Sequence, residues 1–354
     1  MRIRGSMVWF DSCDKQFVEK FGVIEATKMV LDFSSHSNTP FVYDMRQLSS
    51  YLGQSPKAIW GKVKNANKLY NIYEVPKKSG GKRLLCSPKG DLKFTQRRIL
   101  NCFLNKMPVS QYATAYVKGK TLVENACPHT GKKHLLKMDI SDFFGSITFE
   151  QVYSAAFNTR IFPKQIGVAL TKLCCRRDVL PQGAPTSPAL SNLVMKRFDD
   201  YIGSWCKMRG ISYTRYCDDM TFSADKPLYN VYEKVKNMLD EMGFEVNTKK
   251  TRFVTASSRQ SVTGLTVNDH VNVSREYKRE LRKEIHYVLK YGLAQNIMNG
   301  DKSEFVKNYT PNTASYYYNL IGRINYVLQI EPDNYWFRNA LQELKCGEIL
   351  AEIM

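Results

Sequence analysis

The stretch ISYTRYCDDMTFSA, residues 211–224, decides the fold of this chain. Apolar and polar residues alternate over 211–216 and again over 220–224, which is the pattern of half-buried β-strands. Asp218 and Asp219 lie between these strands, so the stretch predicts a β-hairpin with two carboxylates at its turn. Adjacent carboxylates raise each other's pKa, so such a turn is either well solvated or close to a cation.

A third aspartate, Asp139, lies near the end of the apolar run HLLKMDI of residues 134–140, which predicts a buried strand. A buried carboxylate needs a partner, and pairing of this strand beside the hairpin would bring Asp139 close to Asp218 and Asp219. Three carboxylates on adjacent strand ends form a hard-oxygen site suited to Mg²⁺, and two ions about 4 Å apart are a common arrangement. We therefore expect a two-ion magnesium site.

The positive charge of the chain is concentrated in one segment. The 354 residues include 52 Lys and Arg against 33 Asp and Glu, a net charge of +19, and residues 57–133 alone hold 17 basic and 3 acidic residues. Such segregation favours a polyanionic partner, and nucleic acid fits better than an anionic membrane because the segment is not one basic amphipathic helix. Together with the carboxylates it indicates phosphoryl transfer on nucleic acid, by a polymerase or a nuclease.

Other classes fit the sequence poorly. There is no apolar stretch approaching the ~20 residues of a membrane-spanning helix, and the first residues lack the apolar region of a signal peptide, so we expect a cytoplasmic protein. Nine cysteines without a CxxC pair favour reduced thiols over disulfides or zinc. Gly119-Lys120-Thr121 resembles the end of a phosphate-binding P-loop, but Thr114 stands where that loop needs glycine.

The remaining pattern predicts an α+β fold. Helices are expected at 16–31, 44–69, 91–107, from Thr186-Ser187-Pro188 to about Gly210, at 229–242 and at 275–290. Strands are expected at 71–76 and 82–86, as a basic hairpin, and at 244–246 and 252–254.

Four motifs in order resemble those of reverse transcriptases. They are MDISDFF at 138–144 (motif A), LPQGAPTSP at 180–188 (motif B), YCDD at 216–219 (the YxDD motif) and KKT at 249–251 (motif D). The basic hairpin around Lys82 and Arg83 resembles the fingers of the same enzymes. The resemblance covers about residues 70–268, and Cys217 departs from the alanine that is commoner in YxDD.

Two further motifs resemble those of one branch, the retron reverse transcriptases. NACPH at 125–129 matches their NAxxH pattern, and Val262-Thr263-Gly264 matches their VTG pattern. Group II intron, diversity-generating and abortive-infection relatives share the core motifs but are not expected to carry both of these.

The resemblance implies a right-hand polymerase. Its expected parts are an N-terminal helical extension at 1–69, fingers at 70–135, a palm at 136–272 with a fingers insertion around 150–180, and a helical thumb at 273–354. The palm is expected to be an antiparallel sheet with packed helices.

The same resemblance assigns roles in catalysis. Asp139, Asp218 and Asp219 are the catalytic carboxylates, with Asp139 and Asp218 as direct metal ligands and Asp219 shaping the site. Lys250 is the motif D lysine that could protonate pyrophosphate, or an ordinary surface lysine. Phe144 is the steric gate that selects dNTPs.

Nucleotide and RNA contacts follow in the same way. Gln182 and Gly183 border the incoming nucleotide, and Arg83 grips the triphosphate with help from Lys82, Lys77 or Lys78. The expected RNA-binding residues are Asn125, His129, Val262, Thr263, Gly264, Arg275, Arg279 and Arg282. For Asn125 and His129 a turn held by side-chain hydrogen bonds is the alternative, and for the thumb arginines it is ion pairing with neighbouring glutamates.

The implied activity is RNA-directed DNA synthesis with Mg²⁺ and dNTPs. The resemblance further implies a structured noncoding RNA as template, priming from the 2′-OH of an internal guanosine, and a branched RNA–DNA product (msDNA) that stays bound. It also implies antiphage defence with a separate effector protein, in a higher-order complex. A conventionally primed bacterial reverse transcriptase and a nucleic-acid scaffold that restrains an effector remain alternatives.

Overall fold

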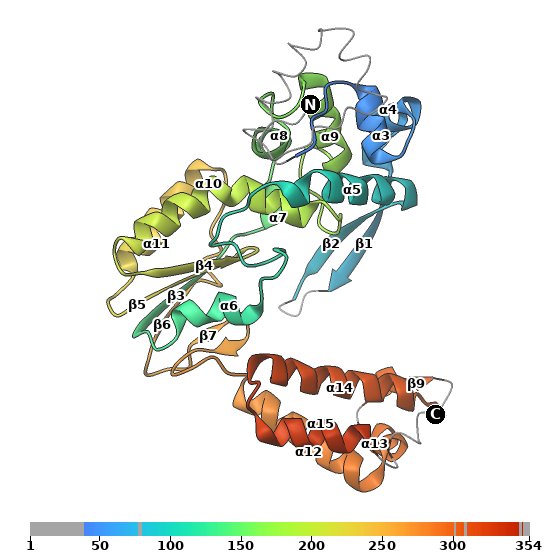
Figure 1. Cartoon of the computed structure of the whole chain (residues 1–354). Helices are drawn as coiled ribbons and strands as arrows, with labels where there is room; N and C mark the ends of the chain where they lie inside the picture. The colour runs from blue at the N-terminus through green and yellow to red at the C-terminus, as the bar shows by residue number, and fades with distance from the viewer. Residues whose placement is uncertain (1–38, 77–79, 301, 308–309, 347–348, 350–354) are drawn as a thin grey trace, which may run out of the picture. The chain divides into compact units, whose positions relative to one another are not determined.

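The computed structural model describes residues 39–354 except 77–79, 301, 308–309, 347–348 and 350–354 (Figure 1). The helix expected at 16–31 lies outside these residues. The described chain forms two compact units. Unit 1 contains residues up to 120, 137–220 and 229–251, and unit 2 contains 121–136, 221–228 and 252–354.

The predicted hairpin forms one side of a four-stranded sheet, with its first strand at the edge. The strands are β3 (His134–Asp139), β4 (Ser212–Tyr216), β5 (Asp219–Ala224) and β6 (Arg252–Thr255), in the order β4-β5-β3-β6 (Figure 1). Only two residues join β4 to β5, so these strands are antiparallel. The α+β class is therefore confirmed, and the buried run ending at Asp139 does lie beside the hairpin.

The strand expected at 244–246 is wrong. Only Val246 takes part in β pairing, as an isolated bridge to Ile140. Phe244 is instead buried against Phe143, with ring centroids 6.0 Å apart. The segment is bonded to the end of β3 by only two backbone hydrogen bonds, from the N–H of Ser141 to Glu245 and from the N–H of Asn247 to Asp139, so the pairing is too short to form a strand.

Helices of unit 1 begin where the sequence supplies caps. Asp44 and Ser55 accept hydrogen bonds from the first turns of α3 (Met45–Leu52) and α4 (Pro56–Asn65), and left-handed Gly53 ends α3. The segment expected as one or two helices at 44–69 is thus two helices followed by a 3₁₀ turn. These helices pack with α5 (Gly90–Cys102) and α9 (Lys164–Cys174).

The basic hairpin and the long helix of unit 1 also form as predicted. Strands β1 (Tyr70–Pro76) and β2 (Lys82–Pro88) are antiparallel, with Val75 opposite Arg83. Helix α10 (Ser187–Lys207) packs against β4 and α8 (Phe149–Ala156). Two further helices are α7 (Phe143–Ser146), at the end of motif A, and α11 (Tyr229–Glu241), between the YxDD motif and motif D.

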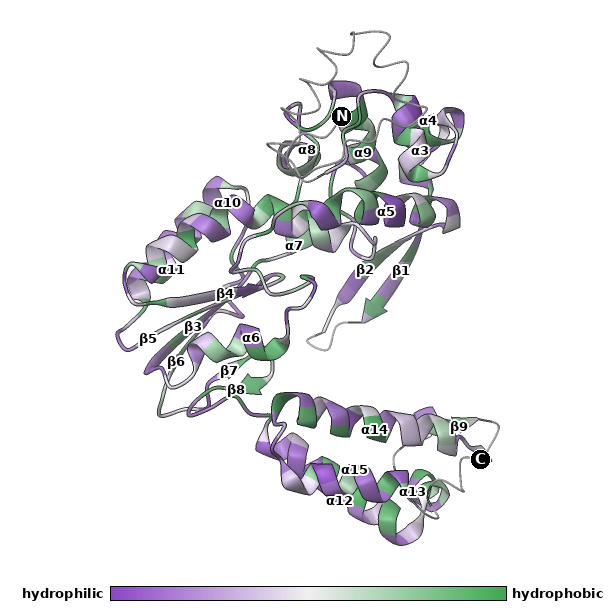
Figure 2. Ribbon diagram, viewed as in Figure 1, coloured by the Kyte–Doolittle hydropathy of each residue, from purple (hydrophilic) through white to green (hydrophobic). Residues whose placement is uncertain are grey.

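Unit 2 is built around one apolar core. Its elements are α6 (Leu122–Ala126), β7 (Ser261–Val262), β8 (Leu265–Thr266), α12 (Arg275–Tyr291), α13 (Leu293–Asn299), β9 (Val306–Lys307), β10 (Thr310–Pro311), α14 (Thr313–Ile330) and α15 (Tyr335–Lys345). Ala126 and Val262 share the core with Leu281, Val327 and Phe337. Figure 2 shows hydrophilic residues dominating α12 and hydrophobic ones recurring along α14. The core therefore joins the two retron-type motifs to the helical tail, across the domain limits expected from the sequence.

Two glycines in helices of unit 1 give a matched test of packing. A Cβ at Gly167 of α9 would lie 2.0 Å from the backbone oxygen of Phe157, whereas a Cβ at Gly61 of α4 would meet nothing within 4 Å. We expect Gly167→Ala to lower the free energy of unfolding by about 1–3 kcal/mol, since backbone cannot easily move aside. Gly61→Ala should raise it by up to about 1 kcal/mol, because alanine is the better helix former. Urea denaturation followed by circular dichroism measures both, and equal effects would contradict the packing described.

Candidate active site and nucleic-acid surfaces

Asp139 is the last residue of β3 and is 5% exposed. Its Oδ1 accepts a hydrogen bond from Lys250 Nζ at 2.8 Å, and its backbone oxygen accepts one from the N–H of Asn247 at 2.8 Å. The hydrogen bond to Asp139 raises the pKa of Lys250, so the lysine is protonated at neutral pH. The structure thus places the motif D lysine against the motif A carboxylate.

The other two carboxylates lie at the turn between β4 and β5. Cys217, the residue before Asp218, has a left-handed backbone with φ of 61°. The N–H of Ile140 donates to the backbone oxygen of Asp218 at 3.2 Å, so the turn is tied to the residue that follows Asp139. Asp219 then begins β5.

The three aspartates repel one another. Burial, followed by the charges of Asp218 and Asp139, raises the pKa of Asp219 to about 6. Burial and the charge of Asp139 also raise the pKa of Asp218. A bound cation would relieve this repulsion, which is the electrostatic condition of a metal site.

The donor set fits Mg²⁺ in chemistry, because carboxylate oxygens are the ligands that this ion prefers. Among the residues that the structure describes, however, no three His, Cys, Asp or Glu side chains are gathered as they would be around a metal ion. Lys250 supplies the positive charge beside Asp139 instead. Asp139 and Asp218 are the residues that would hold the ion, with Asp219 next to them.

The aromatic pair of motif A divides between core and surface. Phe143 is 3% exposed and packs on Phe244, whereas Phe144 is partly exposed, with its ring centroid 5.5 Å from that of Phe143. Asp142, with φ of 40°, is the N-cap residue immediately before α7. Phe144 is therefore the ring of this pair that a nucleotide could reach.

Motif B is held against the basic hairpin. The N–H of Cys86 in β2 donates to the backbone oxygen of Gln182 at 2.7 Å. Gly183 has φ of 112°, and a Cβ there would lie 3.2 Å from the oxygen of Cys86. The glycine is thus required for backbone conformation and close approach to β2, and its predicted contact with a nucleotide remains a prediction.

The cations expected to bind triphosphate lie on the exposed part of β2. Arg83 and Lys82 are both exposed, and Lys82 forms an ion pair across the hairpin with Glu74. Lys77 and Lys78 lie outside the described residues. The position of Arg83 leaves it open to an anion.

The two retron-type motifs contact each other inside unit 2. Asn125 is 1% exposed and its Nδ2 donates to Thr263 Oγ1 at 3.2 Å. His129 is fully buried, its Nδ1 lies 2.7 Å from Ser223 Oγ, and burial lowers its pKa to about 3. Neither side chain has surface for direct contact with RNA in this structure. The hydrogen bonds of both side chains join segments far apart in the chain, so they are not those of a local turn.

The residues of the VTG motif differ in their exposure to solvent. Val262 is fully buried, but Thr263 and Gly264 form the turn between β7 and β8 and are at least partly exposed. Their φ angles of 46° and 87° are left-handed, as tight hairpin turns require. The expectation of direct RNA contact therefore suits Thr263 and Gly264 but not the buried valine.

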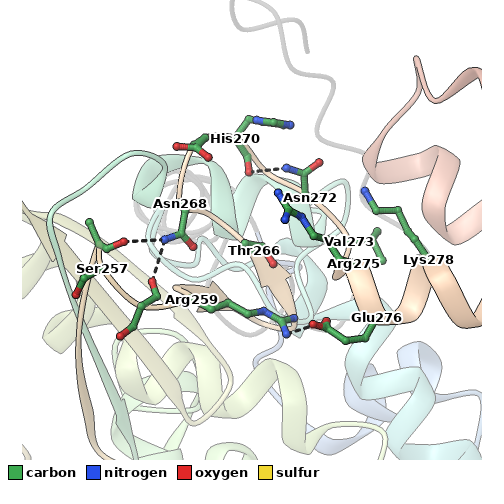
Figure 3. A pocket seen from close by; sticks show the side chains of 13 residues that line it. Ser257, Arg259, Thr266, Asn268, His270, Asn272, Val273, Arg275, Glu276 and Lys278 are labelled. Atoms are coloured by element: carbon green, nitrogen blue, oxygen red, sulfur yellow. Dashed lines mark hydrogen bonds and ion pairs between the residues drawn. The ribbon is translucent and has the colours of Figure 1, made fainter.

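A polar pocket of about 600 Å³ lies beside this hairpin in unit 2 (Figure 3). Arg275 lines it, and Arg259 also lines it while pairing with Glu276 at 3.0 Å. Lys278 also lines the pocket, and it forms an ion pair at 2.7 Å with Glu331, which is not a lining residue. Of the predicted thumb arginines, Arg275 is the one that the pocket contains.

The other two thumb arginines lie on α12. The guanidinium of Arg282 lies 5.5 Å from the ring centroid of Trp336 and 5.2 Å from that of Phe337, so it packs on α15. Arg279 is exposed. The alternative prediction for Arg282 was an ion pair with a neighbouring glutamate of α12. The guanidinium instead lies against two aromatic rings of α15.

Sequence reasoning missed two groups next to the carboxylates. Arg215 and Asp199 form a fully buried ion pair, although alternation in 211–216 puts Arg215 on the same face as Ile211 and could have indicated its burial. Tyr116 has φ of 61°, and its hydroxyl lies 3.5 Å from Cys217 Sγ. No pattern in the sequence indicates the contact of Tyr116.

Comparison with known proteins places this geometry in a family. The family model described as "Reverse transcriptase (RNA-dependent DNA polymerase)" matches residues 75–287. The retron Mx65 reverse transcriptase of Myxococcus xanthus is 39% identical over 236 residues, which are 61% of this chain and 55% of that protein. The retron Ec86 reverse transcriptase of Escherichia coli is 33% identical over 254 residues, which are 70% of this chain and 79% of that protein. The chain thus spans about half the length of the first relative and most of the second.

Solved structures of telomerases are also similar. Telomerase from Candida albicans, in complex with a fragment of telomeric RNA, matches 80% of this chain and 65% of that chain at 12% identity, with a TM-score of 0.42. Apo telomerase from Candida tropicalis matches at 10% identity with the same TM-score, over 80% of this chain and 57% of that chain. Within the described residues, no helix has the length and apolar character needed to cross a membrane.

The repulsion among the carboxylates predicts a titration. In the metal-free protein, carbon-13 NMR should give the Asp219 carboxyl a pKa of about 6, and Asp139→Asn should lower it by removing one of the charges that raise it. Because the pKa of Asp219 in the folded protein is above its ordinary value, its contribution to the free energy of unfolding falls as pH rises from about 4 to about 6. Exposed Asp225 should not respond to the substitution. If the pKa of Asp219 were the same in Asp139→Asn as in the wild type, the two carboxylates would not interact.

Proposed function

The chain belongs to the retron reverse transcriptases, a branch of the RNA-dependent DNA polymerases, and on that premise we propose that it copies RNA into DNA at the site formed by Asp139, Asp218 and Asp219. The observation that supports this most is the position of the three carboxylates at the end of β3 and at the β4–β5 turn, where burial and the neighbouring carboxylates raise the pKa values of Asp218 and Asp219. A nuclease, which the sequence alone left open, is disfavoured by the family.

The residues of the site divide the chemistry between them. Mg²⁺, when bound, stabilises charge on the attacking hydroxyl and on the leaving pyrophosphate. Asp139 and Asp218 would hold it, and Asp219 shapes the pair electrostatically. Lys250 carries a proton at Nζ close to the carboxylates and can donate it to the leaving pyrophosphate, as a general acid does.

Substrate selection would rest on the groups around this site. Phe144 presents a partly exposed ring that would exclude a ribose 2′-OH and so select dNTPs. Arg83 would bind phosphate oxygens, assisted by Lys82, and a guanidinium can do so with two hydrogen bonds. Gln182 and Gly183 would border the nucleotide from motif B.

The retron assignment suggests a particular template and product. The proposed reaction starts at the 2′-OH of an internal guanosine in the chain's own structured noncoding RNA and yields a branched RNA–DNA molecule. It would take place in a bacterial cytoplasm and serve antiphage defence together with a separate effector protein. The exposed VTG turn and the pocket around Arg275 are the surfaces of unit 2 that suit RNA.

The polymerase activity can be tested directly. Purified protein, its RNA, Mg²⁺ and dNTPs, one of them labelled, should give extended DNA. Asp218→Asn with Asp219→Asn should reduce extension by about 1000-fold or more, since removing the charges that hold the metal removes several kcal/mol of transition-state stabilisation. Asp225→Asn changes an exposed carboxylate of unit 2 and should leave extension unchanged. Absence of extension by the wild type, or its persistence in the double variant, would contradict the proposal.

The product distinguishes the retron reaction from its alternatives. A 2′,5′-branched junction is sensitive to a debranching enzyme, whereas a conventionally primed product is not. Insensitive product would favour a conventionally primed reverse transcriptase. If the carboxylate variant still assembles with RNA and controls an effector, the scaffold alternative gains support.

A further inference from the structure

Arg215 of β4 and Asp199 of α10 form an ion pair in which both side chains are fully buried. Arg215 Nε donates to Asp199 Oδ1 at 2.9 Å and to Oδ2 at 3.1 Å, and Arg215 Nη2 donates to Oδ2 at 2.6 Å. The guanidinium therefore meets the carboxylate with two of its nitrogens, which fixes the plane of both groups.

The remaining nitrogen of this guanidinium reaches the catalytic turn. Arg215 Nη1 donates to the backbone oxygen of Cys217 at 2.9 Å. That oxygen belongs to the peptide group joining Cys217 to Asp218, and because a peptide group is planar, holding its oxygen also fixes the N–H of Asp218.

The peptide group on the other side of Asp218 is held as well. Its oxygen accepts a hydrogen bond from the N–H of Ile140 at 3.2 Å. Both peptide groups that flank Asp218 are thus fixed, one by a buried side chain and one by the strand that carries Asp139. The direction of the Cα–Cβ bond of Asp218, from which its carboxylate extends, follows from these two hydrogen bonds.

Further side chains orient the ion pair itself. The hydroxyl of Tyr213 donates to Asp199 Oδ1 at 2.8 Å, and Arg215 Nη2 also donates to Asn192 Oδ1 at 3.2 Å. Asn192 in turn donates to the backbone oxygen of Ala115 at 2.8 Å. Asp199 and Asn192 both lie on α10, the helix that motif B begins, so this helix is connected to the YxDD turn through Arg215.

Stability alone does not account for such a pair. Buried ion pairs can often be replaced by apolar side chains of similar volume without loss of stability, because desolvation of the charges offsets their attraction. Apolar side chains cannot donate a hydrogen bond to the Cys217 carbonyl. Cys217 has a left-handed backbone, which is unfavourable for a residue with a Cβ.

We propose that Arg215 and Asp199 are positioning residues of the polymerase site, which hold the peptide before Asp218 so that its carboxylate can bind metal with Asp139. This inference rests on the proposed function for its catalytic readout, but not for its metal-binding readout. Neither residue touches substrate.

The test is Arg215→Lys in the full chain. Lysine keeps the charge that Asp199 needs, but one ammonium group cannot serve the carboxylate and the Cys217 carbonyl with the fixed fork of arginine. We expect a folded protein with kcat reduced about 100-fold, as small displacements of catalytic groups produce, and with KM for dNTP changed less than about threefold. Without dNTP, the concentration of Mn²⁺ or Mg²⁺ that gives half of the metal-dependent rise in unfolding temperature should increase at least about fivefold.

Two further variants separate positioning from stability. Arg323→Lys changes a partly buried arginine of unit 2 that pairs with Glu284 at 2.6 Å, and it should leave the metal response unchanged. The double change Arg215→Met with Asp199→Leu removes both charges and the bond to Cys217, so it should show the same defects as Arg215→Lys and tests the inference if that variant fails to fold.

The outcomes are distinct. Wild-type kcat and metal response in Arg215→Lys, or in the double variant, would overturn the inference. The inference would also be overturned if kcat and the metal response fell only in proportion to the fraction of folded protein, and if Arg323→Lys lost as much of both. If the wild type does not extend DNA, the proposed function fails, whereas a weakened metal response in Arg215→Lys still supports the positioning role.

Discussion

Three carboxylates of like charge lie close enough to repel one another, and the end of β3 and the β4–β5 turn are built around this constraint. Asp139 is fixed by its place at the end of β3, and Asp218 and Asp219 are fixed by a turn that is bonded to the next residue of that strand. Burial, together with the charges of the other two aspartates, raises the pKa of Asp219. Lys250 offsets part of the repulsion by pairing with Asp139.

Charge elsewhere in the chain is distributed to complement this site. The excess of basic residues lies mostly in 57–133, which includes the β1–β2 hairpin and α5. Lys82 and Arg83 are exposed on the hairpin, where a polyanion can reach them, whereas the carboxylates are on the sheet. Under the proposed function, attraction of nucleic acid and catalysis would therefore rest on different elements, the β1–β2 hairpin and the sheet.

The sequence predicted those parts of the fold and site that depend on local pattern. Alternation was sufficient for the hairpin of β4 and β5, and an apolar run was sufficient for β3 and Asp139. The contacts that it did not predict join segments far apart in the chain, such as Asn125 with Thr263. Residue spacing shows which face a side chain occupies but not which distant segment meets it. Asn125 and His129 were therefore expected at a surface for RNA, although their hydrogen bonds bury them.

Because unit 2 is built from separate segments of the chain, it cannot finish folding early in translation. Its first segment, 121–136, is separated from the last, which begins at 252, by residues 137–220 and 229–251 of unit 1. Asn125 and Thr263 are 138 residues apart, so at a synthesis rate of roughly 5–20 residues per second the ribosome needs roughly 7–28 seconds to supply the partner of Asn125. Over that time Ala126 lacks the core that later buries it, and unit 2 cannot be completed by a chain that stops at the end of unit 1. Folding of this enzyme is therefore expected to finish only after translation has passed the helical tail.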